Sequence, residues 1–345
     1  MLTIGLFLSP PLSMASSHSM EVLQNTKARQ FIDEMVAKHD YPRERLRALF
    51  AEARFVPELI DRVSKPAEAL PWYRYRRIFL KPDRAEAGVD FWHTHRDILA
   101  KVEEVYGVPQ KIIVAILGVE TYFGKRTGKY PVLDSLATLS FRNSLRTKFF
   151  RRELEQFLLL TNEERGLDPH ALKGSYAGAM GLPQFISSSY RRYAIDFDGD
   201  NRRDLIESIP DAVGSAAHYL KEHGWQRDGE IAIPVKVNEK AIRDEFLMKK
   251  RGSKPHLNFS VLKEHGVIGS DVAARTGIAD DEPVALIKLE TENGFVYWIG
   301  LRNFYMITHY NHSNLYAMAV LQLAEDIRKR YSQKYHRTYA LTDAL

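Results

Sequence analysis

The chain has 345 residues, of which 45% are apolar and 27% are charged, which is the balance of an ordinary globular protein. With 20 glycines and 15 prolines, it is neither collagen-like nor of low complexity. It contains no cysteine, which excludes disulfides, thiolate metal ligands, cysteine nucleophiles and an acyl anchor on a cysteine. The net charge of +5 mildly favours a polyanionic partner and leaves nucleic acid, an acidic polysaccharide and an anionic membrane surface open.

The N-terminus carries a short apolar stretch over residues 2–8, followed by Ser13 and Ala15, whose small side chains suit a signal peptidase site. This pattern predicts a signal peptide over residues 1–15 and an exported protein. No Lys or Arg precedes the apolar stretch, so a disordered N-terminal tail is the alternative. No run of 18 apolar residues follows, and we therefore expect no transmembrane segment.

Helical periodicity dominates from Met20 onward. Apolar residues at three-to-four spacing predict amphipathic helices over 23–39, 98–106, 153–160, 212–223 and 313–330. Residues 112–119 are apolar on all sides, which predicts a helix inside the domain, with Pro109 at its first position and Gly124 available to end it.

Three short segments alternate β-branched or aromatic residues and predict strands: 231–237, 284–289 and 294–300. The expected fold class is therefore α+β and mainly α-helical. We expect a helical domain over 20–110, a core over 111–228, a small β-containing domain over 229–300, a return to the core over 301–331 and a tail over 332–345.

Glu120 is the most informative single residue. It follows the buried run on the same helix face as Ile112 and Ile116. Apolar surroundings favour the protonated form of a carboxyl group, which a general acid needs near neutral pH. The alternative is a structural glutamate paired with Lys125 or Arg126.

The segment 174–185 is rich in glycine and alanine, so its backbone can approach a ligand closely. Ser175 and Gln184 add hydrogen-bonding groups, which predicts a groove for a neutral polar polymer. The Lys and Ser/Thr of a phosphate-binding P-loop are absent from it. A flexible hinge between two helices is the alternative.

Residues 196–207 place oxygen donors at the spacing of a calcium loop, with Glu207 at the twelfth position and the Arg202 carbonyl at the seventh. Asn201 replaces the usual glycine at the sixth position, and asparagine also tolerates a left-handed turn. The alternative is a solvated acidic loop whose charge is offset by Arg202 and Arg203.

Five ordered motifs resemble the lytic murein transglycosylase B family over about residues 71–331. They are Gly118–Gly124, Gly174–Phe185, the aspartate-rich loop, His223–Trp225 and Tyr310–Ser313. The resemblance implies a goose-type lysozyme-like catalytic core, an additional helical domain and a small β domain. It also implies cleavage of the MurNAc-β-1,4-GlcNAc bond of peptidoglycan without water, which leaves 1,6-anhydro-MurNAc ends.

The resemblance also implies roles for individual residues, with Glu120 as the sole catalytic acid and base. The substrate-binding residues that it implies are Tyr75, Arg146, Phe149, Ser175, Gln184, Tyr219, Tyr310 and Asn311. Phe149 stands where some members have tyrosine. The implied metal ligands are Asp196, Asp198, Asp200, the Arg202 carbonyl and Asp211, whereas the loop spacing prefers Glu207 as the last ligand.

We expect no cofactor for catalysis, a structural Ca²⁺ or Na⁺, and peptidoglycan glycan strands as the partner. A periplasmic monomer without a lipid anchor follows from the resemblance and the missing cysteine. A hydrolytic muramidase and a non-catalytic binder of a wall polymer are the alternatives. Nucleic-acid binding is not expected, because no helix-turn-helix, RNA-binding or zinc-finger signature is present.

Overall fold

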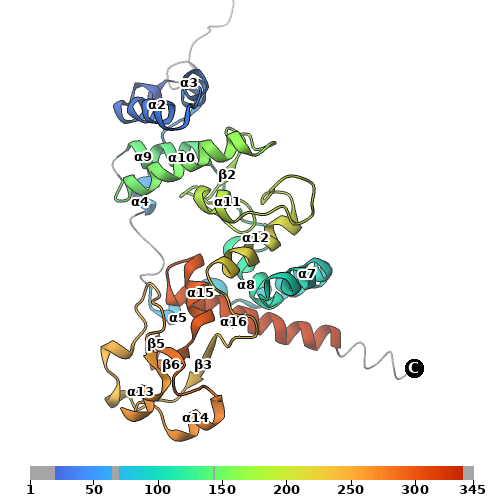
Figure 1. Cartoon of the computed structure of the whole chain (residues 1–345), viewed down its shortest axis with the longest axis vertical. Helices are drawn as coiled ribbons and strands as arrows, with labels where there is room; N and C mark the ends of the chain where they lie inside the picture. The colour runs from blue at the N-terminus through green and yellow to red at the C-terminus, as the bar shows by residue number, and fades with distance from the viewer. Residues whose placement is uncertain (1–19, 64–69, 143, 337–345) are drawn as a thin grey trace, which may run out of the picture. The chain divides into compact units, whose positions relative to one another are not determined.

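The computed structural model describes residues 20–63, 70–142 and 144–336 (Figure 1). The predicted signal peptide over 1–15 and residues 337–345 of the predicted tail lie outside the described residues. Contacts divide the chain into two compact units, each built from two separate segments. The first unit is Met1–Ser64 with Lys129–Gly178, and the second is Lys65–Gly128 with Ala179–Leu345. This division does not follow the boundaries at 110 and 228 that the sequence suggested.

The first unit is helical, apart from one short antiparallel pair of strands. Its core contains Phe31, Phe50 and Phe141, which pack edge to edge or edge to face with ring centroids 5.6–6.1 Å apart. Helices α9 and α10 pack side by side in Figure 1. The elements are α1 (Glu21–Gln24), α2 (Thr26–His39), α3 (Arg43–Glu52), α4 (Glu58–Val63), β1 (Tyr130–Pro131), α9 (Val132–Phe141), α10 (Thr147–Glu163) and β2 (Lys173–Gly174).

Asn25 interrupts the helix that the sequence predicts over 23–39. Its side-chain oxygen accepts hydrogen bonds from the backbone N–H groups of Lys27 and Ala28, at 2.9 and 3.3 Å. This is the bonding of an N-cap, where asparagine is among the preferred residues. The prediction of one continuous helix is therefore wrong, because the helix is interrupted at Asn25.

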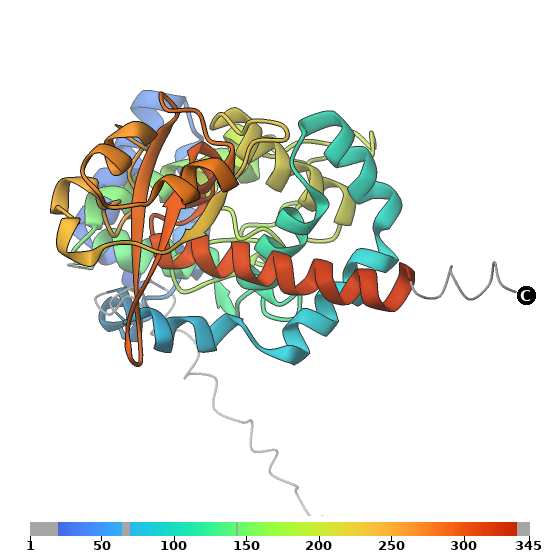
Figure 2. The same ribbon diagram turned by 90° about the horizontal axis from the view of Figure 1, so that it is seen from below.

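Buried helix α8 lies at the centre of the second unit, as its apolar sequence predicts. It begins at Gln110, one residue later than predicted, because Pro109 is the N-cap. The residues from Ile112 to Val119 are all buried. Helix α16 packs along α8, α6 and α5, and Figure 2 shows it crossing the unit as a long helix. The main helices are α5 (Trp72–Phe79), α6 (Pro82–Thr94), α7 (Arg96–Tyr106), α8 (Gln110–Thr121), α11 (Ser187–Tyr193), α12 (Ile209–Glu222), α15 (Arg302–Tyr310) and α16 (Asn314–Tyr331).

The three predicted strand segments are confirmed and form one antiparallel sheet with a fourth, two-residue strand. Its strand order is β3-β6-β5-β4. Ile299 pairs with Ile233 on one side and with Leu286 on the other, so that apolar side chains of three strands meet on one face. That face and the neighbouring short helices enclose a separate apolar core. The elements are β3 (Ala232–Val235), η2 (Glu239–Ala241), η3 (Asp244–Phe246), β4 (Leu257–Asn258), α13 (Phe259–Glu264), α14 (Ser270–Thr276), β5 (Pro283–Thr291) and β6 (Gly294–Gly300).

The fold is mainly α-helical with small sheets, as the sequence predicts. A short π-helical segment, η4 (Ser332–His336), follows α16. Within the described residues, no helix combines the length and the apolar character that crossing a membrane requires.

Candidate active site

Glu120 lies in the last turn of α8. The helix ends at Thr121 because Tyr122 and Phe123 adopt left-handed backbone angles, with φ of 52° and 58°. The end therefore comes before Gly124, which the sequence had suggested as the terminating residue. The Thr121 hydroxyl donates to the Leu182 carbonyl at 3.0 Å and so fixes this helix end to the glycine-rich segment. The Glu120 side chain is half-buried.

Tyr316 forms a hydrogen bond with the Glu120 side chain. Its hydroxyl, on α16, donates to Oε1 of Glu120 at 2.6 Å. Burial, followed by the charge of Glu120, raises the pKa of Tyr316 well above 10, so the phenol stays protonated. This residue was not predicted from the sequence. The available signal was its position three residues after the Tyr310–Ser313 motif, in a helix turn that is otherwise apolar.

An aromatic group formed by Phe185, Tyr219 and Tyr310 lies in the same unit. Their ring centroids are 5.1–5.9 Å apart. The Tyr310 ring also stacks on Tyr316, at 6.4 Å and an interplanar angle of 12°. Because Tyr316 in turn contacts Glu120, the rings of two predicted substrate-binding residues are joined to the carboxylate through direct contacts.

Both tyrosine hydroxyls of this group hold backbone carbonyls. Tyr219 donates to His309 at 2.7 Å, and Tyr310 donates to Pro183 at 2.8 Å. Burial raises the pKa of both phenols, so they remain donors. The rings are thereby held in fixed orientations, which is what stacking on a sugar ring needs.

Gln184, a predicted substrate-binding residue, also has a structural role. Its Nε2 donates to the carbonyls of Thr127 and Gly181, at 2.9 and 3.0 Å. Both N–H bonds of the amide therefore hold the backbone, and the carbonyl oxygen Oε1 is the group left for a ligand. Gly181 has φ of 72°, and a Cβ atom there would lie 2.3 Å from the Leu205 carbonyl. This close approach requires glycine.

The other predicted substrate residues of this unit differ in burial. Tyr75, on α5, is only 1% exposed and contacts the rings of Trp72 and Phe79, with centroids 6.5 and 5.3 Å away. Its aromatic ring is therefore mainly part of the core. Asn311 is half-buried at the C-terminal end of α15.

Arg146, Phe149 and Ser175 belong to the first unit, whereas Glu120 belongs to the second. The structure brings two of them together, because the Arg146 guanidinium lies 4.1 Å from the Phe149 ring centroid. The Ser175 hydroxyl oxygen accepts from the Ala177 backbone N–H at 3.3 Å and shapes its own turn.

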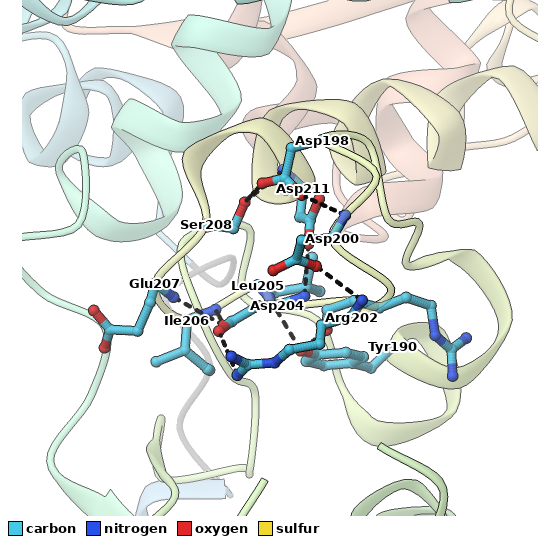
Figure 3. A network of polar contacts seen from close by, with 11 residues as sticks. Tyr190, Asp198, Asp200, Arg202, Asp204, Leu205, Ile206, Glu207, Ser208 and Asp211 are labelled. Atoms are coloured by element: carbon cyan, nitrogen blue, oxygen red, sulfur yellow. Dashed lines mark hydrogen bonds and ion pairs between the residues drawn. The ribbon is translucent and has the colours of Figure 1, made fainter. Parts of the chain in front are cut away.

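The acidic loop brings four carboxylates together. Oxygen atoms of Asp196, Asp198, Asp200 and Asp211 all lie within 4.8 Å of one another. Asn201 has φ of 67°, the left-handed conformation that its position at the sixth place of the loop predicts. Figure 3 shows the Glu207 side chain pointing away from Asp198, Asp200 and Asp211. The geometry thus favours Asp211 over Glu207 as the last carboxylate.

Asp211 holds both ends of this loop. It is fully buried, and its two oxygens accept from the backbone N–H groups of Phe197 and Asp204, each at 2.7 Å. Burial raises the pKa of this carboxyl, and the two backbone hydrogen bonds lower it. Asp198 accepts from the Ser208 hydroxyl at 2.8 Å. Four carboxylates at this spacing repel one another, and a bound cation removes the repulsion.

Comparison with known proteins adds evidence that is independent of this geometry. The family model for the transglycosylase SLT domain matches residues 24–325. The membrane-bound lytic murein transglycosylase B of Escherichia coli is 39% identical over 333 residues, which cover 94% of this chain and 88% of that protein.

Two solved structures are also similar. The lytic transglycosylase Slt35 of Escherichia coli, in complex with calcium, has a TM-score of 0.80 and 38% identity over 92% of this chain and 99% of that one. SltB3 of Pseudomonas aeruginosa, in complex with NAG-anhNAM-pentapeptide, has a TM-score of 0.72 and 28% identity over 87% of this chain and 78% of that one. The matches extend over most of the chain, and we conclude that it belongs to the lytic murein transglycosylases, enzymes that act on peptidoglycan.

Proposed function

We propose that this enzyme cleaves the MurNAc-β-1,4-GlcNAc bond of peptidoglycan without water, with Glu120 acting first as acid and then as base. The observation that best supports this proposal is the placement of the carboxyl group, which is half-buried at the end of α8 and oriented by a protonated tyrosine. The NAG-anhNAM-pentapeptide bound to the related SltB3 supports the anhydro product.

The reaction balances with a single carboxyl group. Protonated Glu120 donates its proton to the glycosidic oxygen, the bond from C1 to that oxygen breaks, and GlcNAc leaves with a free hydroxyl. The N-acetyl group of MurNAc stabilises the positive charge that develops at C1. The Glu120 carboxylate then takes the proton of the C6 hydroxyl, whose oxygen bonds to C1, and the acid is regenerated.

Tethering explains why the C6 hydroxyl reacts in preference to water. It belongs to the same sugar as C1, and such intramolecular reactions reach effective concentrations of about 10⁵ M or more. Most hydrolytic glycosidases use a second carboxylate as nucleophile or as the base that activates water. No acidic residue shares the helix face of Glu120 in α8.

Tyr316 is a positioning residue in this proposal. Its hydroxyl donates to Oε1 of Glu120 and so orients the carboxyl group toward the glycosidic bond. The sugars stack on the rings of Tyr219 and Tyr310, and the amide carbonyl of Gln184 accepts a hydrogen bond from them. Arg146, Phe149 and Ser175 of the first unit are proposed substrate contacts from the family resemblance.

The acidic loop is a proposed calcium site with a structural role. The carboxylates of Asp196, Asp198, Asp200 and Asp211 and the Arg202 carbonyl would hold the ion, and oxygen ligands of this kind suit Ca²⁺. The calcium complex of the related Slt35 supports this assignment. No catalytic step involves the ion. We further propose that the enzyme acts in the periplasm, as a monomer.

Digestion in ¹⁸O-labelled water tests the reaction. We expect mass spectrometry of the products to show anhydro-MurNAc ends that carry no label and are lighter by one water than reducing ends. Labelled, reducing MurNAc as the main product would instead identify a hydrolytic muramidase. Absence of any product from purified peptidoglycan would indicate a binding protein.

A further inference from the structure

A basic pocket of about 400 Å³ opens in the second unit, outside the site described above. Its lining comes from α5, from the start of α6 and from the turn that follows α8. Four of the lining side chains are basic and one is acidic, so the pocket attracts anions. The polar and aromatic residues that matter here are Arg77, Lys81, Asp83, Arg84, Tyr122 and Arg126.

Arg84 is the buried cation of this pocket. It is only 7% exposed, and its guanidinium lies between the rings of Phe79 and Tyr122, 5.2 and 5.3 Å from their centroids. Its Nε and Nη1 atoms are buried and have no hydrogen-bond partner within the described part of the chain. A buried charged group without such partners is costly, and native structures rarely leave one unexplained.

The neighbouring charges compensate Arg84 only in part, because Asp83 favours its charged form less than burial and Arg126 oppose it. Burial, and then the nearby Arg126, lower the pKa of its guanidinium. Asp83 is the adjacent carboxylate, but it already accepts a hydrogen bond from the Tyr122 hydroxyl at 3.2 Å. Arg77 pairs with Glu292. An anion in the pocket would therefore supply the missing negative charge to Arg84, Lys81 and Arg126.

The pocket is continuous with the elements that carry the proposed catalytic machinery. Tyr122 and Arg126 follow Glu120 in the turn after α8. On α5, the Phe79 ring that covers Arg84 contacts the Tyr75 ring at 5.3 Å. Tyr122 thus brings the lining of the pocket to within two residues of Glu120 along the chain.

We propose that the basic pocket binds a carboxylate of the peptide stem of peptidoglycan, and this proposal rests on the function proposed above. A carboxylate matches a planar guanidinium in shape and charge, and Arg84 with Arg126 offers two such groups. The side chains of Ile78 and Tyr122 in the lining suit the aliphatic parts of a short peptide. This contact would select glycan strands that carry peptide stems over strands that lack them.

Calorimetric titration with a synthetic stem pentapeptide tests the proposal in a Glu120→Gln background, where no bond is cleaved. We expect Lys81→Gln and Arg126→Gln each to weaken peptide binding by roughly tenfold, the effect of losing one charge-assisted contact. Arg275→Gln, at an exposed position of α14, is the matched control and should leave the affinity unchanged. The same peptide with amidated carboxyl groups should bind weakly and respond to none of these variants.

Arg84→Met keeps an unbranched side chain between the two rings and should abolish the carboxylate dependence, provided that its thermal unfolding is unchanged. If Arg84→Met changes the thermal unfolding, the variants at the exposed residues Lys81 and Arg126 test the proposal instead. Unchanged peptide affinity in both exposed variants would overturn the proposal. Displacement of the peptide by inorganic phosphate at equal concentration would also overturn it, because the pocket would then bind oxyanions in general. Peptide binding by an enzyme that releases no anhydro product would contradict the proposed reaction and leave the pocket assignment standing.

Discussion

The Tyr316 hydroxyl lies 2.6 Å from the Glu120 carboxylate, so a change at either residue alters the same hydrogen bond. Glu120→Gln keeps the shape of the side chain and removes the transferable proton. We expect the release of muropeptides to fall by about two orders of magnitude or more, with thermal unfolding nearly unchanged. Glu264→Gln, at an exposed position of α13, should retain full activity. Near wild-type turnover by Glu120→Gln would exclude it as the acid.

Tyr316→Phe tests the positioning role separately from the acid. The phenol is protonated throughout the neutral range because burial raises its pKa well above 10, so the wild-type enzyme always donates this hydrogen bond. Its loss destabilises the charged form of the Glu120 carboxyl group, and the acidic form persists to higher pH. The descending, alkaline limb of the pH–rate profile should therefore move to higher pH. A uniform loss of activity at every pH would instead indicate a purely structural tyrosine.

At the scale of elements, the acidic loop gives a clear test of ligand choice. Calcium should raise the melting temperature of chelator-treated protein, because a ligand at about 100 times its Kd stabilises the folded state by about 2.7 kcal/mol. Asp200→Ala should abolish this gain, and Glu207→Gln, whose side chain points away from the carboxylates in Figure 3, should retain it. A gain that disappears in Glu207→Gln would restore Glu207 as a ligand. Catalysis should continue in the metal-free protein.

The sequence predicted six helical segments and three strands because their signals are local. Apolar spacing identified the helices, and alternation identified the strands of the sheet. The break at Asn25 was also readable, since a residue that prefers N-caps stood inside the expected helix. The end of α8 was not, because it depends on left-handed angles at Tyr122 and Phe123 that few non-glycine residues adopt.

Contacts between residues far apart in sequence could not be predicted from local patterns. Glu120 and Tyr316 are separated by 196 positions, and no local pattern indicates that they meet. The basic pocket likewise joins Arg84, which the sequence analysis did not single out, to the turn after α8. The division of each unit into two separate segments was not predicted either. Periodicity identifies the apolar face of a helix but does not identify the helix that packs against it.

At the scale of the whole molecule, three half-buried histidines predict that acid destabilises the fold. Burial, and then His223 and His312, lower the pKa of His309 to about 4, and burial also lowers the pKa of His223 and His95. The unfolded chain binds these protons near pH 6.5, whereas the folded chain binds them only at lower pH. The contribution of these histidines to stability is therefore complete above pH 6.5 and is lost as the pH falls toward 4.

Urea unfolding between pH 7 and pH 4.5 measures this loss. His309→Gln should make the free energy of unfolding depend less steeply on pH in that window than it does in the wild type. His256→Gln, at an exposed position, should have the wild-type slope. Equal slopes in all three proteins would assign the acid sensitivity to carboxyl groups instead.

Helix α16 covers α8, yet it lies at the far end of the described chain. A polypeptide leaving the ribosome therefore carries the face of α8 that α16 covers without this partner until residues 314–331 have been added, and a chaperone that shields such a surface would act during this interval. Over the same interval Glu120 has no Tyr316 beside it. A chain that ends before α16 would thus lack the positioned acid, which ties the proposed activity to the synthesis of this helix.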